Sequence, residues 1–258
     1  MKDKVAIVSG SSAGIGLAIA ETLAKAGASV VINGRTPEKL NRAKSEIEHF
    51  GGKVLAVRAD VSKAEEIKRL VDETKNHFGR IDALINNAAT VGVGLSVEKM
   101  PLEIWDEVLN TNLRAVFLFC QAVIPYLREQ SGGRIVNIGG LSSKNPLPFA
   151  AADACSKAGI SALTRVLAAE LGSVNITVNT VIPSFQPDTE IGKIFNEKLA
   201  AAFHITPEES IAGTKARTLL KRFETLDEIS QTVLFLCSEA GAAITGQNLN
   251  VNCGLATY

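Results

Sequence analysis

A carboxylate and an ammonium group stand four residues apart in the segment Asp153-Ala154-Cys155-Ser156-Lys157. In a helix this spacing places Asp153 and Lys157 on the same face, one turn apart. A free aspartic acid has a pKa of about 3.9, and a nearby ammonium favours its ionised form. Such a carboxylate accepts protons weakly and donates none at neutral pH. The pair therefore predicts acid–base chemistry or ion binding at this point of the chain.

Glycines gather in the segment Ser9-Gly10-Ser11-Ser12-Ala13-Gly14-Ile15-Gly16, between a β-branched run and a helical pattern that reaches Lys25. Glycine lets the chain turn tightly and lets its backbone approach a ligand, while the N–H groups of the following helix attract an anion. A strand–glycine–helix order is the context in which such a motif binds a dinucleotide. We expect the phosphates of a nicotinamide dinucleotide to lie against Gly10, Ser12, Gly14, Ile15 and Gly16.

The end of the second predicted strand bears on which dinucleotide binds. An acid at this position would bond the ribose 2′-hydroxyl and repel a 2′-phosphate. The sequence instead reads Asn33-Gly34-Arg35, and a guanidinium suits a phosphate well. NADP(H) is therefore favoured over NAD(H). The glycine turn carries Ala13 rather than a second basic residue, so NAD(H) stays open as the alternative.

Short apolar runs alternate with longer helical patterns along the whole chain. Runs that are apolar throughout are typical of parallel strands covered on both faces, and the alternation predicts a doubly wound seven-stranded parallel sheet, a Rossmann fold. We expect a single domain over residues 1–258. The predicted strands are Val5–Ser9, Ser29–Asn33, Val54–Arg58, Asp82–Asn86, Gly133–Ile138, Ile176–Ile182 and Asn248–Asn252.

Local signals mark where helices begin and where the alternation breaks. Capping boxes are predicted at Ser62-x-x-Glu65 and Thr225-x-x-Glu228, and Thr36-Pro37 predicts a cap followed by proline. Residues 183–220 form a longer excursion after the sixth strand. Ligands in such folds lie beyond the carboxyl ends of the strands, so this excursion is predicted to be a lid or substrate wall.

Further motifs follow the glycine turn at regular intervals, and together they resemble the short-chain dehydrogenase/reductase family over about residues 4–254. The glycine turn corresponds to the family fingerprint T-G-x-x-x-G-x-G. The other matching segments are Asp60-Val61, Asn86-Asn87-Ala88-Ala89, Thr111-Asn112-Leu113, Lys157-Ala158-Gly159, Asn179 to Pro183 and Thr245-Gly246-Gln247. Two of them depart from the family pattern, since Ala89 and Ser184 replace glycines.

The resemblance implies roles for these residues. Asp60 and Val61 would contact the adenine, Asn87 and Ala88 would line the cofactor site, and Pro183 would lie on the nicotinamide side. Lys157 would hold the nicotinamide ribose, and Asn112 would hold a water for proton relay. The family reduces carbonyls or oxidises alcohols, and its members usually assemble as dimers or tetramers. We therefore expect a homodimer or homotetramer that pairs the helices Glu107–Gln130 and Ala152–Leu171.

Two groups of the family's chemistry are absent from this chain. Counting back four residues from Lys157 reaches Asp153, where the family has its proton-donating tyrosine, and counting back thirteen more reaches Gly140, where it has a serine. An ionised carboxylate cannot replace a phenol as a donor. The candidates to replace the lost hydroxyls are Ser142, if the loop shifts, and Asp153, His204, Tyr126 and Tyr258.

Three functions remain open at this point. The first is an NADP(H)-dependent oxidoreductase for small carbonyl or alcohol substrates. Asn112 and Lys157 are in place, and its rebuilt proton donor is Asp153, Ser142, His204 or the substrate itself. The second is a non-redox enzyme on the same scaffold, namely an isomerase, dehydratase or decarboxylase. The third is a catalytically inactive dinucleotide-binding regulator.

Composition excludes other classes of function. Lys plus Arg and Asp plus Glu both number 27, so the chain lacks the basic surplus of a nucleic-acid binder. The four scattered cysteines predict free thiols in a reducing compartment. No metal-ligand cluster is visible. We see no apolar stretch of about 18 residues that would span a membrane, and we expect a cytoplasmic protein.

Overall fold

Seven parallel strands form one sheet in a computed structural model that describes residues 1–258. Their order across the sheet is β3-β2-β1-β4-β5-β6-β7. The predicted Rossmann fold is therefore confirmed, and each strand lies within one residue of its expected bounds at either end. The strands are β1 (Val5–Val8), β2 (Ser29–Gly34), β3 (Lys53–Arg58), β4 (Ala83–Asn86), β5 (Gly133–Ile138), β6 (Ile176–Pro183) and β7 (Asn248–Val251).

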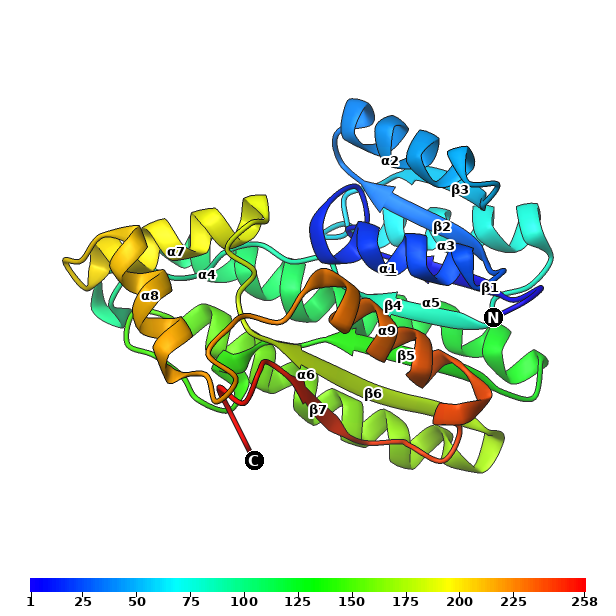
Figure 1. Ribbon diagram of the computed structural model, residues 1–258. Coiled ribbons are helices and arrows are strands. Elements are labelled where there is room, and N and C mark those ends of the chain that lie inside the picture. Colours follow the sequence, from blue (N-terminus) through cyan, green and yellow to red (C-terminus); the bar gives the residue numbers. More distant parts are fainter.

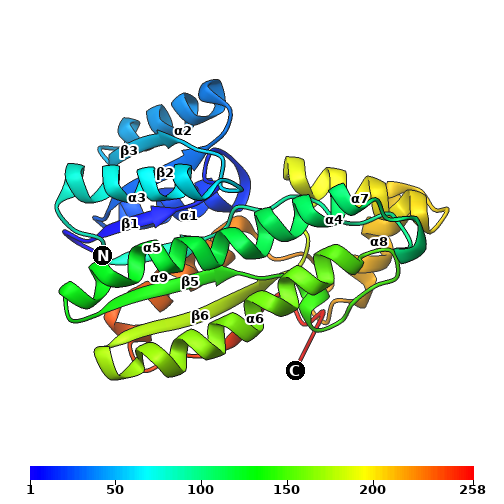
Figure 2. The same cartoon turned by 180° about the vertical axis from the view of Figure 1, so that it is seen from behind.

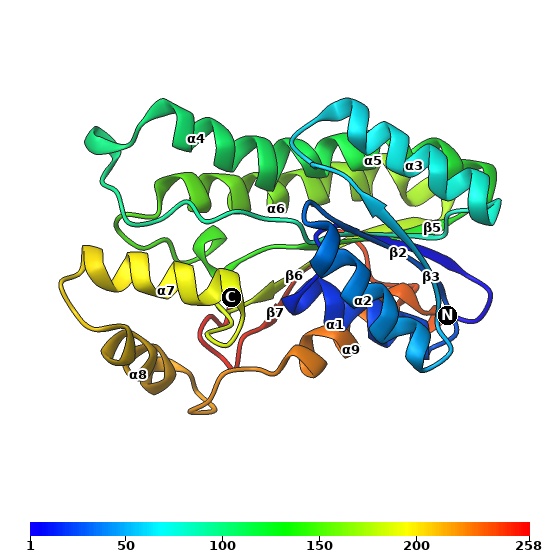
Figure 3. The same cartoon turned by 90° about the horizontal axis from the view of Figure 1, so that it is seen from above.

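Helices cover both faces of this sheet, which Figure 3 shows along its edge. The helices are α1 (Gly14–Lys25), α2 (Pro37–His49), α3 (Ala64–Phe78), α4 (Leu102–Leu109), α5 (Ala115–Glu129), α6 (Ala151–Leu171), α7 (Glu190–Ala202), α8 (Pro207–Arg217) and α9 (Leu226–Cys237). Helices α3, α5 and α6 lie on one face, and α1, α2 and α9 lie on the other. A π-helical turn, η2 (Asn110–Arg114), joins α4 to α5, and a short 3-10 turn, η3 (Leu141–Ser143), follows β5.

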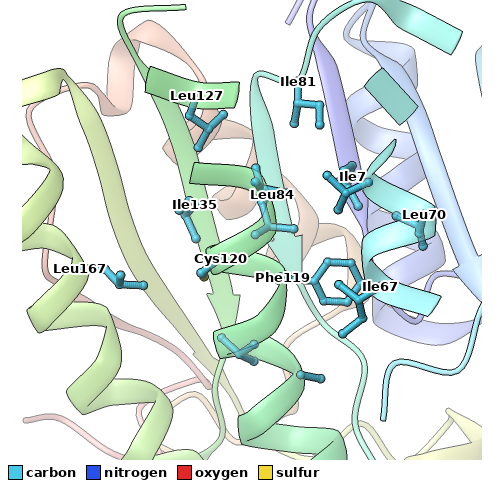
Figure 4. Close-up of a cluster of buried hydrophobic side chains, with 14 of the residues drawn as sticks. Ile7, Ile67, Leu70, Ile81, Leu84, Phe119, Cys120, Leu127, Ile135 and Leu167 are labelled. Atoms are coloured by element: carbon cyan, nitrogen blue, oxygen red, sulfur yellow. The ribbon is translucent and has the colours of Figure 1, made fainter. Parts of the chain in front are cut away.

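Alternate residues of each strand feed two separate cores. On β1, Ile7 packs with Leu84, Phe119 and Leu127 beneath α3, α5 and α6, a cluster that Figure 4 shows. Its neighbours Ala6 and Val8 face the opposite core beneath α1, α2 and α9. Successive strand side chains point to opposite faces, so a strand buried on both sides must be apolar throughout. This is why the apolar runs of the sequence locate the strands so closely.

The chain reverses its direction of winding at β1, because β1 pairs with β2 on one side and with β4 on the other. In doubly wound sheets this point opens a crevice beyond the carboxyl ends of the strands. Helices α7 and α8, yellow and gold in Figure 1, project beyond those ends. They belong to the excursion of residues 183–220, whose role as a lid stays a prediction, and the excursion is called the lid below. The fold thus brings the glycine turn and the lid to the same edge of the sheet.

Helix starts agree with the sequence at two of three predicted places. Thr225 and Glu228 form the expected capping box, and Pro37 follows the cap residue Thr36. The box at Ser62 is wrong. Helix α3 begins at Ala64, because Ser62 bonds Asp60 instead of capping the helix. The structure also has a capping box that the sequence analysis missed, between Thr206 and Glu209 at the start of α8.

One helical stretch corrects the expectation about membranes. Residues Leu102–Glu129 run as a continuous helix that is long and apolar enough to cross a bilayer by length and composition. In the fold, its residues Phe119, Val123 and Leu127 are fully buried against the sheet. Core packing therefore accounts for part of the apolar character of this stretch.

Candidate active site

A cavity of about 770 Å³ runs along the carboxyl edge of the sheet, from the glycine turn to the lid. One end is bounded by Gly10, Ser12, Gly14 and Ile15, and the other by η3, α6 and the lid. Most of the residues expected at the cofactor site line it, including Arg35, Asp60, Val61, Asn87, Ala88 and Pro183. Gly16 and Asn112 are the two expected site residues that do not line it.

The glycine turn is held by close backbone contacts. Gly10 has φ +62°, and a Cβ atom there would lie 2.7 Å from the Cα of Ala88. Gly16 packs behind the turn, where a Cβ atom would lie 2.5 Å from the carbonyl oxygen of Gly10. The Asn87 side chain fastens the turn from the neighbouring strand by donating to the carbonyl oxygens of Ser9 and Gly10 at 3.0 and 2.9 Å. Gly16 therefore shapes the turn without reaching the ligand.

The end of β2 carries a glycine, Gly34, at a position where a side chain would come too close to Ser12. A Cβ atom on Gly34 would lie 2.8 Å from the hydroxyl oxygen of Ser12. A glutamate or aspartate at position 34 would therefore require Ser12 to move. The neighbouring Arg35 is exposed and lines the cavity, and its guanidinium forms no ion pair within the chain. This corner of the cavity offers a cation and a hydroxyl to an anionic group.

Asp60, which follows β3, lines the same end of the cavity. Burial raises the pKa of Asp60, but hydrogen bonds from Ser62 and the nearby charge of Arg35 outweigh that effect, and the net pKa lies below its usual value. An ionised Asp60 accepts hydrogen bonds and donates none. It can therefore bond an amino or hydroxyl group of a bound nucleoside.

A buried polar chain anchors α6, the helix that carries Asp153 and Lys157. Asn86 donates to Asn137, Asn137 donates to Thr164 on α6, and the hydroxyls of Thr164 and Thr180 pair, each at 2.8 Å. These hydrogen bonds favour one arrangement of the packed elements, although Asn86 Oδ1 is buried without a hydrogen-bond partner. Helix α6 is therefore locked to β4, β5 and β6, and its first turn faces the cavity.

Ser142 and Asp153 meet on the wall of the cavity. The Ser142 hydroxyl donates a hydrogen bond to Asp153 Oδ2 at 2.6 Å. This bond joins η3 to the first turn of α6. Gly140 has extended backbone with φ −173°, and the three atoms nearest to a Cβ there would be side-chain carbons of Lys157, at 3.3 to 3.5 Å.

Lys157 is buried beneath this pair. Its ammonium donates to the carbonyl oxygen of Ile138 at 3.3 Å and lines the cavity. Burial lowers the pKa of Lys157 below its usual value, and the charge of Asp153 opposes that shift. A buried ammonium with one hydrogen bond in the chain keeps donors free for a ligand.

Asn112 does not line the cavity, and its implied role of holding a water for proton relay stays a prediction. Its Oδ1 accepts from the Thr90 N–H at 2.7 Å, and its Nδ2 donates to the Thr90 carbonyl oxygen at 3.1 Å. Both polar ends of the side chain are therefore used to hold the loop after β4. Because Thr90 itself lines the cavity, Asn112 acts on the site through that loop.

The lid is fastened at its base by a buried glutamate that the sequence analysis missed. Glu224 Oε1 accepts from the backbone N–H of Ser184 at 2.6 Å and from Gln186 Nε2 at 2.8 Å. The Ser184 hydroxyl donates to the same carboxylate. Burial raises the pKa of Glu224, and these hydrogen bonds oppose the shift. Forty residues separate Glu224 from Ser184 in the chain, so no local pattern could have linked them.

None of the aromatic or imidazole candidates lines the cavity. His204 is exposed beyond the end of α7, and Tyr126 contacts Asp72 on the far side of the sheet. Tyr258 donates to the carbonyl oxygen of Lys144 outside the cavity. No phenol therefore borders the site, and the Ser142 hydroxyl stands nearest to the Asp153 carboxylate.

The far end of the cavity is mostly apolar and lies under the lid. Phe185 stacks on Phe195 with ring centroids 5.7 Å apart. Lys198 and Arg217 add two cations that form no ion pair in the chain. The other apolar residues of this wall are Val91, Ile104, Leu141, Leu147, Ile191, Ile194, Leu199 and Leu255.

A family model described as Enoyl-(Acyl carrier protein) reductase matches residues 10–256. The chain is 35% identical to 3-oxoacyl-[acyl-carrier-protein] reductase of Thermotoga maritima, covering 99% of this chain and 98% of that protein. The chain belongs to the short-chain dehydrogenase/reductase family. It is also 33% identical to D-beta-hydroxybutyrate dehydrogenase of Rhizobium meliloti, covering 97% of this chain and 98% of that protein.

Solved structures of this short-chain dehydrogenase/reductase kind superpose along the entire chain. Actinorhodin polyketide ketoreductase, solved with NADPH, is 33% identical with a TM-score of 0.94 and covers 99% of this chain and 98% of its own. Levodione reductase is 28% identical with a TM-score of 0.94 and covers both chains completely. The protein is thus a nicotinamide-dependent oxidoreductase of the ketoacyl-reductase-like kind.

Proposed function

We propose that this protein is an NADP(H)-dependent reductase of small carbonyl compounds. In this proposal Ser142 donates a proton to the substrate, and Asp153 returns a proton to Ser142. The observation that carries the proposal is the 2.6 Å hydrogen bond from the Ser142 hydroxyl to Asp153 Oδ2, on the cavity wall beside buried Lys157. The family resemblance assigns the tyrosine to position 153 and the serine to position 140. A serine two residues further along the same turn supplies the missing hydroxyl.

The proposed proton path has two steps. NADPH, when bound, supplies the hydride that reaches the carbonyl carbon. The Ser142 hydroxyl gives its proton to the carbonyl oxygen, and a protonated Asp153 carboxyl group replaces that proton across their hydrogen bond. The alcohol product has then gained one hydride and one proton. Alcohol oxidation reverses both steps, with the Asp153 carboxylate as the final acceptor.

This path predicts a slow reductase at neutral pH. The path lacks the phenol that the family resemblance implies as the general acid. A well-matched general acid contributes typically 10²- to 10⁴-fold to a rate. Lys157 holds the nicotinamide ribose in this proposal, and its buried ammonium keeps a positive charge beside the developing oxyanion.

NADP(H) is the proposed cofactor because of the corner formed by Ser12, Gly34 and Arg35. The exposed guanidinium of Arg35 forms no ion pair in the chain, and Gly34 leaves no carboxylate to repel a phosphate. A planar guanidinium binds phosphate oxygens in pairs. NAD(H) would leave Arg35 without a partner.

The substrate class follows from the lid wall. Its apolar residues favour a short carbon chain or ring, and Lys198 and Arg217 favour an acidic group at the far end. We propose β-keto acids and their thioesters, which agrees with the names of the ketoacyl reductases and the hydroxybutyrate dehydrogenase among the relatives. Assembly through α5 and α6 is proposed as well, since Phe117 and Val166 are about half exposed on these helices. A cytoplasmic location remains a prediction.

The test is single-turnover oxidation of bound NADPH with acetoacetate, acetoacetyl thioesters and a cyclic diketone. We expect measurable turnover with at least one β-keto substrate. Ser142→Ala should lower its rate about 10²-fold. Ser143→Ala is the matched control, because that hydroxyl bonds the carbonyl oxygen of Gly140 and does not line the cavity. No turnover with any carbonyl, or equal rates for both variants, would exclude the proposal.

A non-redox reaction is the second candidate, and the Asp153 carboxylate on the cavity wall favours it. A carboxylate paired with a hydroxyl can remove a proton next to a carbonyl group, as isomerases and dehydratases require. Deuterium exchange at the α-carbon of acetoacetyl thioesters with NADP⁺ bound would separate the candidates. Exchange that depends on Asp153 without NADPH consumption would favour the second.

A further inference from the structure

An ion pair closes the cofactor groove between two elements that are far apart in the sequence. Lys39 on α2 and Glu190 at the start of α7 lie 2.5 Å apart, from Nζ to Oε2, and both line the main cavity. The two residues are separated by 151 positions. Figure 3 shows α2 and α7 on either side of the carboxyl edge of the sheet. This pair is a direct contact between the cofactor-binding half and the lid at that edge.

The start of the lid lies directly over the glycine turn. A Cβ atom on Gly14 would be only 3.4 Å from Cγ2 of Thr189, the residue that caps α7. The Lys39–Glu190 pair therefore lies across the groove in which the dinucleotide phosphates are expected. A ligand that enters this groove must pass beneath the pair or part it.

Lys39 lines the same cavity as Arg35, which precedes it by four positions in the chain. Helix α2 begins with Thr36 and Pro37, and the Thr36 hydroxyl caps no backbone N–H. Arg35, Thr36 and Lys39 thus border the cavity together with cationic and donor groups, while Glu190 is the carboxylate across from them. A phosphate monoester carries about −1.5 to −2 charges at neutral pH, more than a carboxylate. It therefore competes well for the lysine.

We propose that Lys39 and Glu190 form a latch that the 2′-phosphate of NADP(H) opens by drawing the Lys39 ammonium away from Glu190. NAD(H) has no group that can do so, and it must bind with the latch closed. The ion pair then couples the choice of cofactor to release of the lid. This inference rests on the proposed use of NADP(H) and deepens it.

Binding of two small probes tests the latch without turnover. The probes are 2′,5′-ADP, which carries the 2′-phosphate, and 5′-AMP, which lacks it; their affinities are measured by calorimetry. Lys39→Met should weaken 2′,5′-ADP binding about three- to tenfold, and Glu190→Gln should strengthen it about two- to fivefold, as expected for exposed charges. Binding of 5′-AMP should change less than about twofold in both variants.

Matched control variants come from the same two helices. Lys44→Met breaks a similar exposed pair with Glu48 on α2, and Glu197→Gln removes a carboxylate of α7, yet neither Lys44 nor Glu197 lines the cavity. Both should bind the two probes as the unmodified protein does. If Glu190→Gln weakens 2′,5′-ADP binding as Lys39→Met does, or if Lys39→Met weakens both probes equally, the latch is excluded.

Hydrogen exchange of the first turns of α7 gives a second readout. We expect 2′,5′-ADP to accelerate exchange over residues 188–196 and 5′-AMP to leave it unchanged. Glu190→Gln should exchange rapidly from the start, with no further increase. Slower exchange with 2′,5′-ADP would overturn the latch. If the protein binds both probes and NADP⁺ but reduces no carbonyl, the proposed reaction fails and the latch stands. If it binds neither probe, the latch fails together with the proposed cofactor.

Discussion

The two ends of the cavity are built in different ways. At the cofactor end, the shape depends on backbone contacts that tolerate almost no change, such as the 2.7 Å approach of a Cβ on Gly10 to Ala88. At the chemistry end, a few side chains from η3 and α6 decide what the site can do. Ser142 and Asp153 join these elements through a single hydrogen bond.

This difference shows which part of an enzyme can change most easily. A residue that replaces Gly10 or Gly16 must displace backbone, whereas the atoms nearest to a Cβ at position 140 belong to the side chain of Lys157. The core network through Asn137 and Thr164 keeps α6 in place whichever residue its first turn carries. The dinucleotide site can therefore persist while the proton donor is replaced.

Restoring the family's two hydroxyls at the chemistry end should have the largest effect, and that effect should be on the rate of carbonyl reduction. Asp153→Tyr combined with Gly140→Ser should raise carbonyl reduction about 10²-fold or more, because it returns a general acid and a polarising donor. Gly140 accepts a side chain, since its backbone is extended and only the flexible Lys157 lies near. Gly140→Ser alone is the control and should change the rate little. No gain in the double variant, measured by NADPH oxidation, would mean that the two ends are not independent.

A substitution at the cofactor end should have an intermediate effect, and that effect should be on the affinity for NADP⁺. Gly10→Ala should weaken NADP⁺ binding at least about tenfold, because the new Cβ atom displaces the loop after β4. Gly51→Ala is the control, because Gly51 also has positive φ, at +80°, but no atom lies within 4 Å of its Cβ position. Both substitutions pay the cost of a left-handed backbone. Only the Gly10 variant should lose the ligand, as measured by fluorescence titration, and equal losses would contradict this account.

Changes at the base of the lid should have the smallest effect. Because burial raises the folded-state pKa of Glu224, its contribution to stability is greatest below about pH 4.5 and is lost as the pH rises through the raised pKa. Glu224→Gln should therefore gain stability relative to the unmodified protein between pH 5 and pH 8. The free energy of unfolding, measured in urea at pH 5 and pH 8 for both proteins, checks the sign of this gain. The gain should be about 1 kcal/mol or less. A relative loss with rising pH would show that the carboxylate is held in its ionised form.

The sequence predicts much of the cofactor end and little of the lid. Strands buried on both faces have apolar runs that mark them directly, and the glycine turn has a local pattern. The Ser62 capping box failed because Asp60 competes for the serine hydroxyl. The contacts Ser184–Glu224 and Lys39–Glu190 join residues 40 and 151 positions apart, so only the folded chain reveals them. The sequence named Ser142 and Asp153 separately as candidate donors, but only the folded chain shows the hydrogen bond between them.

A double-mutant cycle on Ser142 and Asp153 tests the central claim most directly. The measurement is the single-turnover rate of NADPH oxidation with the best β-keto substrate for Ser142→Ala, Asp153→Asn and the double variant. If the two residues act as one relay, each single change removes the entire path, and the double variant is no slower than either single variant. Rates that fall multiplicatively, or an Asp153→Asn variant as fast as the unmodified protein, would contradict the relay.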